Sequence, residues 1–217
     1  RQMKELKKHM QLIFQDPFSS LNPRMTVSQS IALPLIIQGI IKKNDKNALN
    51  KKVEEMMDLV GLASRFVNSY PHELDGGRRQ RIGIARALSL NPQFIVCDEP
   101  VSALDVSIQA QILNLMQDLQ KEMGLTYLFI THDLSVVKHL ANKIMVMYLG
   151  NVVEVLPGGQ LSKDAVHPYT RALMGSVFDI NMDFSKPIEN LEGEAPSPLE
   201  LPEGCPFQGR CTKCMAI

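Results

Sequence analysis

Two adjacent carboxylates, Asp98 and Glu99, follow a short apolar run over residues 94–97. The run is typical of a strand buried on both faces, and the turn pair Asn91-Pro92 precedes it. Ligands bind outside the carboxyl ends of the strands in an open parallel sheet, so the acidic pair is placed to meet a nucleotide. One carboxylate can hold Mg²⁺ through water, and the other can orient or deprotonate a water beside a γ-phosphate. Taken alone, the pair is more simply explained as a solvated acidic turn.

Two further stretches place residues that could bind a phosphate or act in catalysis at the end of a strand or the start of a helix. Leu74-Asp75-Gly76-Gly77-Arg78 precedes an amphipathic helix. Glycines at a helix start let the backbone approach a phosphate, where free N–H groups and the helix dipole favour an anion. Downstream, His132 follows an apolar strand over residues 126–131. A lone histidine is more often structural than catalytic, so its position relative to the other stretches decides how it is interpreted.

The order of these stretches resembles the ATP-binding-cassette (ABC) ATPases. Residues 91–105 resemble the Walker B segment and D-loop, residues 73–82 the ABC signature, and residues 127–133 the next strand with the switch histidine. Three ordered motifs between residues 73 and 133 are far more specific than any one of them. The chain is therefore identified as a member of this family.

The resemblance implies a role for each matching residue. Glu99 would be the general base and Asp98 would hold Mg²⁺ through water. Gln15, after a strand over residues 11–14, resembles the Q-loop glutamine that reaches the Mg²⁺ and the attacking water. His132 would contact the γ-phosphate, and Asp105 of the D-loop would contact the partner subunit.

The signature residues Asp75, Gly76, Gly77 and Arg78 would serve the ATP held by the opposite subunit of a dimer. The usual family text is Leu-Ser-Gly-Gly-Gln, and this chain departs from it at Asp75 and Arg78. The usual serine donates a hydrogen bond to the γ-phosphate, whereas an ionised aspartate only accepts. Two like charges about 4 Å apart repel by roughly 1–4 kcal/mol, which Arg78 could partly offset. We hypothesise a weakened or non-catalytic composite site; the alternative is that Asp75 is an N-cap.

Composition excludes several other classes of function. The chain has 23 Lys and Arg against 23 Asp and Glu, so no net field favours nucleic acid or an anionic membrane surface. The apolar stretch 31–41 is short and interrupted by Pro34 and Gly39, so it does not predict a membrane span. No signal peptide is visible, and we expect a cytosolic location.

The pattern of elements predicts an α/β fold: a parallel sheet with flanking helices, a helical subdomain at about 26–90, and a C-terminal extension. We expect the nucleotide-binding part over residues 1–157 and the extension over 158–217. Apolar residues from Leu49 to Val60 recur at helical spacing, as core packing requires. Two strands, 144–149 and 151–155, flank Gly150, and the alternation of strands with helices predicts parallel βαβ units.

The extension resembles that of oligopeptide/dipeptide-importer ATPases at residues 167–173, 191–198 and 204–207. This narrows the family to its peptide and nickel import branch. Cys97 lies in a core strand and is expected to be a small buried hydrophobe. Cys205 and Cys211 match the first two positions of the family's iron–sulfur cysteines, while Cys214 does not. We expect no stable metal here, with a cluster only in a longer chain; three thiolates in a zinc site are a weaker alternative.

The resemblance implies an ATPase subunit of a peptide-type importer that uses ATP and Mg²⁺ at the cytoplasmic face of the membrane. Its partners would be a second ABC ATPase subunit, transmembrane permease subunits and, indirectly, an extracytoplasmic substrate-binding protein. The sequence has no Gly-Lys pair and hence no phosphate-binding G-x-x-x-x-G-K-[ST] loop. We therefore expect a fragment of a longer cassette that is inactive alone. A non-catalytic regulatory fragment and a cysteine-rich metal-binding module are the alternatives.

Overall fold

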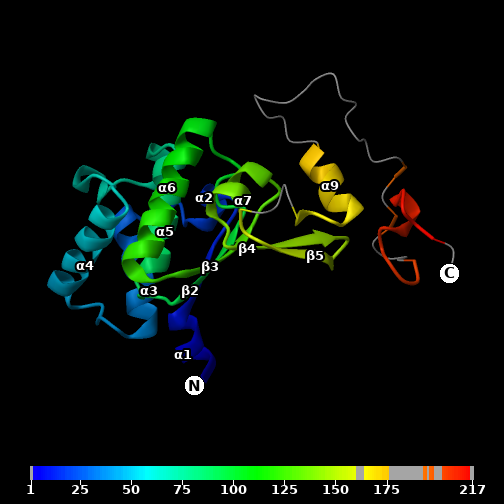
Figure 1. Cartoon of the computed structure of the whole chain (residues 1–217). Coiled ribbons are helices and arrows are strands. Elements are labelled where there is room, and N and C mark those ends of the chain that lie inside the picture. The colour runs from blue at the N-terminus through cyan, green and yellow to red at the C-terminus, as the bar shows by residue number, and fades with distance from the viewer. Residues whose placement is uncertain (1, 160–163, 176–192, 195, 198–201, 216–217) are drawn as a thin grey trace. The chain divides into compact units, whose positions relative to one another are not determined.

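The computed structural model describes residues 2–159, 164–175, 193–194, 196–197 and 202–215. The chain forms two compact units, Arg1–His132 and Asp133–Ile217, which we describe separately (Figure 1). No helix in the described ranges is long and apolar enough to cross a bilayer.

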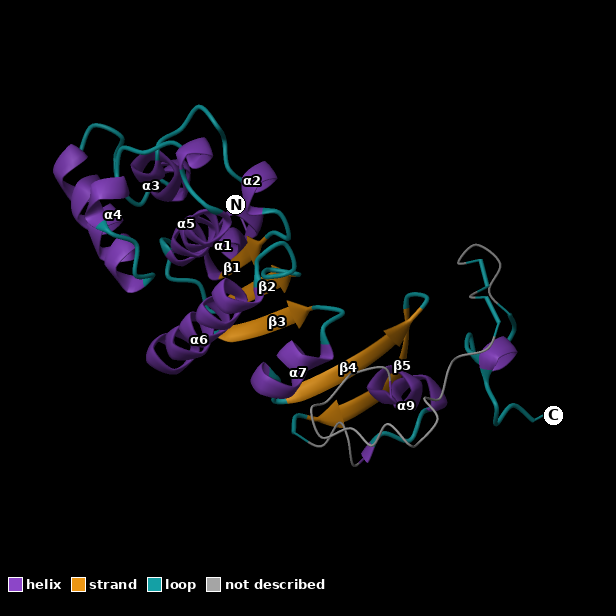
Figure 2. Ribbon diagram, turned by 90° about the horizontal axis from the view of Figure 1, so that it is seen from above, coloured by secondary structure: helices purple, strands orange, loops and turns teal. Residues whose placement is uncertain are grey.

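The first unit is organised around a three-stranded parallel sheet in the order β1-β2-β3 (Figure 2). The strands are β1 (Met10–Ile13), β2 (Phe94–Asp98) and β3 (Thr126–Ile130). Ile13 lies opposite Cys97, and Asp98 lies opposite Ile130. This register brings the carboxyl ends of all three strands to the same edge of the sheet.

Most helices of this unit begin where the sequence places capping residues. They are α1 (Gln2–His9), α2 (Pro17–Ser20), α3 (Val27–Gln38), α4 (Lys46–Leu59), α5 (Gly76–Leu88) and α6 (Val106–Met123), with the short 3₁₀ turns η1 (Ser64–Phe66) and η2 (Pro71–Glu73). Thr26 starts α3 with a capping box, its hydroxyl accepting from the N–H of Gln29. The α4 stripe is buried as predicted, at Leu49, Val53, Met56 and Met57. Helix α5 is central and contacts α2, α3, α4, α6 and β1.

The sequence predicts strands buried on both faces of the sheet, but one face of the sheet is partly exposed. Ile95 and Cys97 are fully buried, but Leu12, Leu128 and Ile130 are 40%, 50% and 48% exposed. The alternation follows from the period of two along a strand, which sends successive side chains to opposite faces. Within the described ranges, the face that carries Ile95 and Cys97 is the more deeply buried of the two.

The second unit contains α7 (Leu134–Leu140), β4 (Lys143–Tyr148), β5 (Asn151–Pro157), α9 (Pro168–Gly175) and the turn η3 (Gln208–Arg210). Strands β4 and β5 pair antiparallel in a sheet of their own, so the expectation of parallel units does not extend to this part. The reason is the connection, since Leu149 and Gly150 alone join the strands and both have positive φ, as a two-residue hairpin turn requires. Ile144, Val146 and Leu156 form the hairpin's buried face.

Candidate functional site

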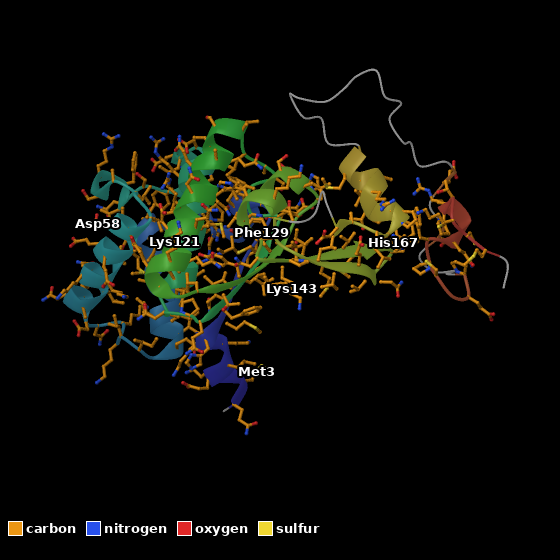
Figure 3. All side chains as sticks on the ribbon, viewed as in Figure 1. Met3, Asp58, Lys121, Phe129, Lys143 and His167 are labelled. Carbon is orange, nitrogen blue, oxygen red and sulfur yellow. The ribbon has the colours of Figure 1, made fainter. Side chains whose placement is uncertain are left out.

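Three polar side chains meet at the carboxyl edge of the parallel sheet. The Gln15 amide donates from Nε2 to Oε2 of Glu99 over 2.8 Å. The Nδ1 atom of His132 lies 2.9 Å from Oε1 of the same carboxylate. The three residues follow β1, β2 and β3 respectively; Phe129, labelled in Figure 3, marks the strand that leads to His132. Both oxygens of Glu99 are thus hydrogen-bonded by groups from the two neighbouring strand ends.

The two partners of this contact differ in their access to solvent. The Glu99 side chain is 23% exposed, whereas that of His132 is 74% exposed. A neutral imidazole with its proton on Nδ1 donates to the carboxylate, and a protonated imidazole forms an ion pair with it. The arrangement therefore holds a carboxylate in a fixed orientation next to an imidazole that is open to solvent.

The Glu99 backbone is in the left-handed region, with φ 41°. Its N–H donates to the Ile130 carbonyl over 3.0 Å, and its own carbonyl accepts from the Ser102 N–H over 3.2 Å. The Ser102 hydroxyl donates to the same carbonyl over 3.1 Å. Sequence reasoning missed this feature, because a glutamate carries no signal for positive φ.

Asp98 is the last residue of β2, exposed and directly before Glu99. Mg²⁺ needs only one or two protein carboxylates, because phosphates and waters supply its other ligands. An exposed carboxylate at the end of the central strand fits that requirement.

The signature residues Asp75 and Arg78 are paired with each other. The Asp75 carboxylate caps α5 by accepting from the N–H of Arg78 over 2.8 Å. Its other oxygen forms an ion pair with the Arg78 guanidinium, which also stacks on the Phe66 ring at 4.8 Å from its centroid. Asp75 is therefore the N-cap residue of α5, a role that does not depend on a nucleotide. A cavity of about 260 Å³ lies alongside, lined by these three residues together with Arg65, Arg81 and Ile108.

The two signature glycines have a packing role that sequence reasoning missed. A Cβ on Gly77 would lie 2.6 Å from Cγ2 of Ile108, and one on Gly76 would lie 3.1 Å from Cδ2 of Leu104. Ile108 lies in the first turn of α6, and Leu104 lies just before that helix. Gly77 is thus needed for the close packing of α5 on Ile108, and Gly76 makes a tight contact with Leu104.

We expect Gly77→Ala to lower the free energy of unfolding by roughly 1–3 kcal/mol, because the added methyl group overpacks the contact with Ile108. Urea unfolding followed by circular dichroism measures the change. Gly83→Ala is the matched control in the same helix, since no heavy atom lies within 4 Å of its added Cβ. Equal stability of the two variants would contradict the packing role.

Asp105 of the D-loop stretch caps α6 in the same way. Its carboxylate accepts from the N–H of Ile108 over 3.1 Å and from the Ser107 hydroxyl over 2.9 Å. The bond from the Ile108 N–H, followed by that from Ser107, lowers the pKa of Asp105. The carboxylate is therefore ionised at neutral pH and fixed at the exposed start of α6.

The cysteines do not form a metal centre in the described residues. Cys97 is fully buried, as predicted, and burial raises the pKa of its thiol to about 12. Cys205 and Cys214 are exposed and Cys211 is half-buried. Among the residues that the structure describes, no three His, Cys, Asp or Glu side chains are grouped to hold a metal ion. The hypothesised iron–sulfur ligands Cys205 and Cys211 therefore carry no step of the chemistry below.

The segment that bears these cysteines is instead anchored by an aromatic contact. Phe207 is fully buried, with its ring centroid 5.2 Å from that of Tyr148 and 5.5 Å from those of Tyr169 and His167. This packing holds residues near 207 against the β4–β5 hairpin and α9.

Comparison with known proteins agrees with this fold. Residues 1–102 match the family described as ABC transporter. The dimeric post-hydrolysis state of the ATP-binding cassette MJ0796, bound to ADP and Pi, superposes with a TM-score of 0.62 at 31% identity, over 71% of this chain and 65% of that one. The cassette cbiO1 from Clostridium perfringens gives a TM-score of 0.62 at 26% identity, over 72% of this chain and 59% of that one. The fold is thus that of the ABC ATPase cassettes.

The relatives narrow the class further. Residues 153–217 match the family described as oligopeptide/dipeptide transporter, C-terminal region. The oligopeptide transport ATP-binding protein OppF of Haemophilus influenzae is 52% identical over 98% of this chain, and OppF of Escherichia coli is 53% identical over 93%. The chain belongs to the ABC ATPases, in the oligopeptide/dipeptide transporter branch. It spans 64% and 60% of the length of these two relatives.

Proposed function

We propose that this chain is the part of an importer's ATPase subunit that carries the base for ATP hydrolysis, driving import of peptides or related substrates such as nickel chelates. The observation that supports this is the contact of Gln15 and His132 with the two oxygens of Glu99. The relatives named oligopeptide transport ATP-binding proteins support the class of substrate.

In this proposal Glu99 accepts the proton of the attacking water, and Gln15 and His132 orient its carboxylate. His132, being largely exposed, would meet the γ-phosphate from the solvent side. Asp98 would hold Mg²⁺ through water, and the ion would neutralise charge on the phosphates. Asp105 and the signature residues Asp75, Gly76, Gly77 and Arg78 would act across the interface with a second ATPase subunit.

The proposed partners are that second ATPase subunit, identical or different, and transmembrane permease subunits at the cytoplasmic face of the membrane. A substrate-binding protein would act indirectly. The proposed helical subdomain, at about 26–90, contains α3, α4 and α5, and it would meet the permease. We retain residues 1–157 and 158–217 as the proposed domains.

We expect the 217 residues alone to bind ATP weakly and not to turn it over, because their sequence lacks the lysine-bearing phosphate loop. Isothermal titration calorimetry with ATP and Mg²⁺ measures the affinity. The comparison is a chimaera in which these residues replace the matching segment of the Haemophilus influenzae relative. Binding by the chimaera but not by the chain supports the proposal, and micromolar binding by the chain alone contradicts it.

A second candidate is a non-catalytic or regulatory ABC subunit. The ion pair between Asp75 and Arg78 favours it, since it places a carboxylate where the signature would face a phosphate. ATP hydrolysis by the chimaera distinguishes the two candidates.

A further inference from the structure

We propose that Ser102 is a positioning residue, which fixes the Glu99 backbone so that the carboxylate stays between Gln15 and His132. This inference rests on the proposed role of Glu99 as general base. It concerns a residue that hydrogen-bonds to the backbone of Glu99.

The starting observation is the backbone of Glu99. Its φ of 41° is disfavoured for a residue with a Cβ atom, because the side chain approaches the backbone closely. Such a conformation persists only where the surroundings hold it. On one side the Glu99 N–H donates to the Ile130 carbonyl over 3.0 Å, which extends the pairing of β2 with β3 by one bond.

On the other side the Glu99 carbonyl accepts two bonds from one residue. The N–H of Ser102 donates over 3.2 Å and closes a turn over residues 99–102. The Ser102 hydroxyl donates over 3.1 Å to the same oxygen. Pro100, at the second position, fixes its own φ, as is common in such turns. Ser102 is thus the only residue of the turn that binds the Glu99 carbonyl through both its backbone and its side chain.

The geometry of the carboxylate depends on this turn. Gln15 and His132 come from the ends of β1 and β3, so their positions are set by the sheet and not by the turn. Rotation of the Glu99 backbone moves the carboxylate relative to both partners, which lie at 2.8 and 2.9 Å. Misplacement of a catalytic group by about 1 Å can cost about 10²-fold in rate. Loss of one of three bonds that hold the backbone is expected to cost less, about tenfold.

The test uses Ser102→Ala and Ser102→Thr in the chimaera. Thr keeps the hydroxyl, so we expect Ala to lower kcat about tenfold with KM unchanged and Thr to restore it to within about threefold. Ser89→Ala is the matched control, since its hydroxyl donates over 2.8 Å to the carbonyl three residues earlier, that of Arg86. Hydrogen exchange in the 217-residue chain tests the turn in the absence of nucleotide and of a partner subunit. We expect the amides of residues 99 and 102 to exchange faster in Ser102→Ala than in the parent.

The outcomes separate this inference from the function on which it rests. If Ser102→Ala has the kcat of Ser89→Ala, or if Thr loses as much activity as Ala, the positioning role is wrong. Unchanged exchange at residues 99 and 102 also overturns it. If Glu99→Gln retains full activity, it is the proposed function that fails.

Discussion

Replacing Glu99 with glutamine in the chimaera is expected to lower kcat for ATP hydrolysis by roughly 10²–10⁴-fold and to leave ATP binding in place. Glutamine has the shape of glutamate and can still hydrogen-bond to Gln15 and His132, but it cannot accept the proton of a water. Because Glu99 is held by bonds of 2.8 and 2.9 Å to both of its oxygens, the change removes basicity with little change in packing.

Phosphate release measured at saturating ATP, with binding followed by calorimetry, tests this expectation. Glu122→Gln on the exposed part of α6 makes the same chemical change away from the site. Activity of Glu99→Gln within about threefold of the parent would show that Glu99 is not the base.

The double change Asp75→Ser with Arg78→Gln is expected to raise ATP hydrolysis about tenfold, if the signature of this chain serves a nucleotide across a dimer. The repulsion between the carboxylate and a phosphate is about 1–4 kcal/mol, and Arg78 already offsets part of it. A tenfold gain corresponds to removal of about 1.4 kcal/mol, near the lower end of that range. Serine also supplies a hydroxyl donor, and it is a good N-cap, so the start of α5 remains stable.

The single variants test the contribution of the ion pair. Arg78→Gln leaves the Asp75 carboxylate without the guanidinium that now pairs with it, so it should lower activity below the parent. Asp75→Ser leaves Arg78 stacked on Phe66 and should raise activity. A double-mutant cycle then gives the coupling between the two residues.

Rates are measured over a range of chimaera concentrations, because the composite site needs a second subunit. The control exchanges the same residue types at exposed positions, Asp58→Ser with Arg24→Gln; Asp58 is labelled on α4 in Figure 3. No gain in rate from the double change would refute the hypothesis of a weakened composite site.

Local pattern predicted much of this fold. The apolar runs before Glu99 and His132 are strands, the stripe from Leu49 to Met57 is buried in α4, and Cys97 is a buried thiol. These features depend on side-chain periodicity and on polarity over a few residues, which the sequence displays directly. The order of three motifs also identified the family, which the comparisons confirm.

Other features depend on segments that are distant in the sequence. The open apolar face of the parallel sheet, with Leu12 and Leu128 exposed, depends on which elements cover it. Gly77 is needed because Ile108 of another helix lies against it. The antiparallel β4–β5 hairpin forms a sheet separate from β1, β2 and β3.

The candidate site shows the same division. The sequence by itself determined which residue types stand at the three strand ends, namely an amide, a carboxylate and an imidazole. Only the tertiary structure decided that they touch: Gln15 and Glu99 are 84 residues apart in the chain, and the parallel register of β1, β2 and β3 brings them within hydrogen-bonding distance. The positive φ of Glu99 has the same origin. It is held by the carbonyl of Ile130 and by Ser102. A backbone hydrogen bond to a neighbouring strand does not depend on residue type, so the sequence alone does not predict it.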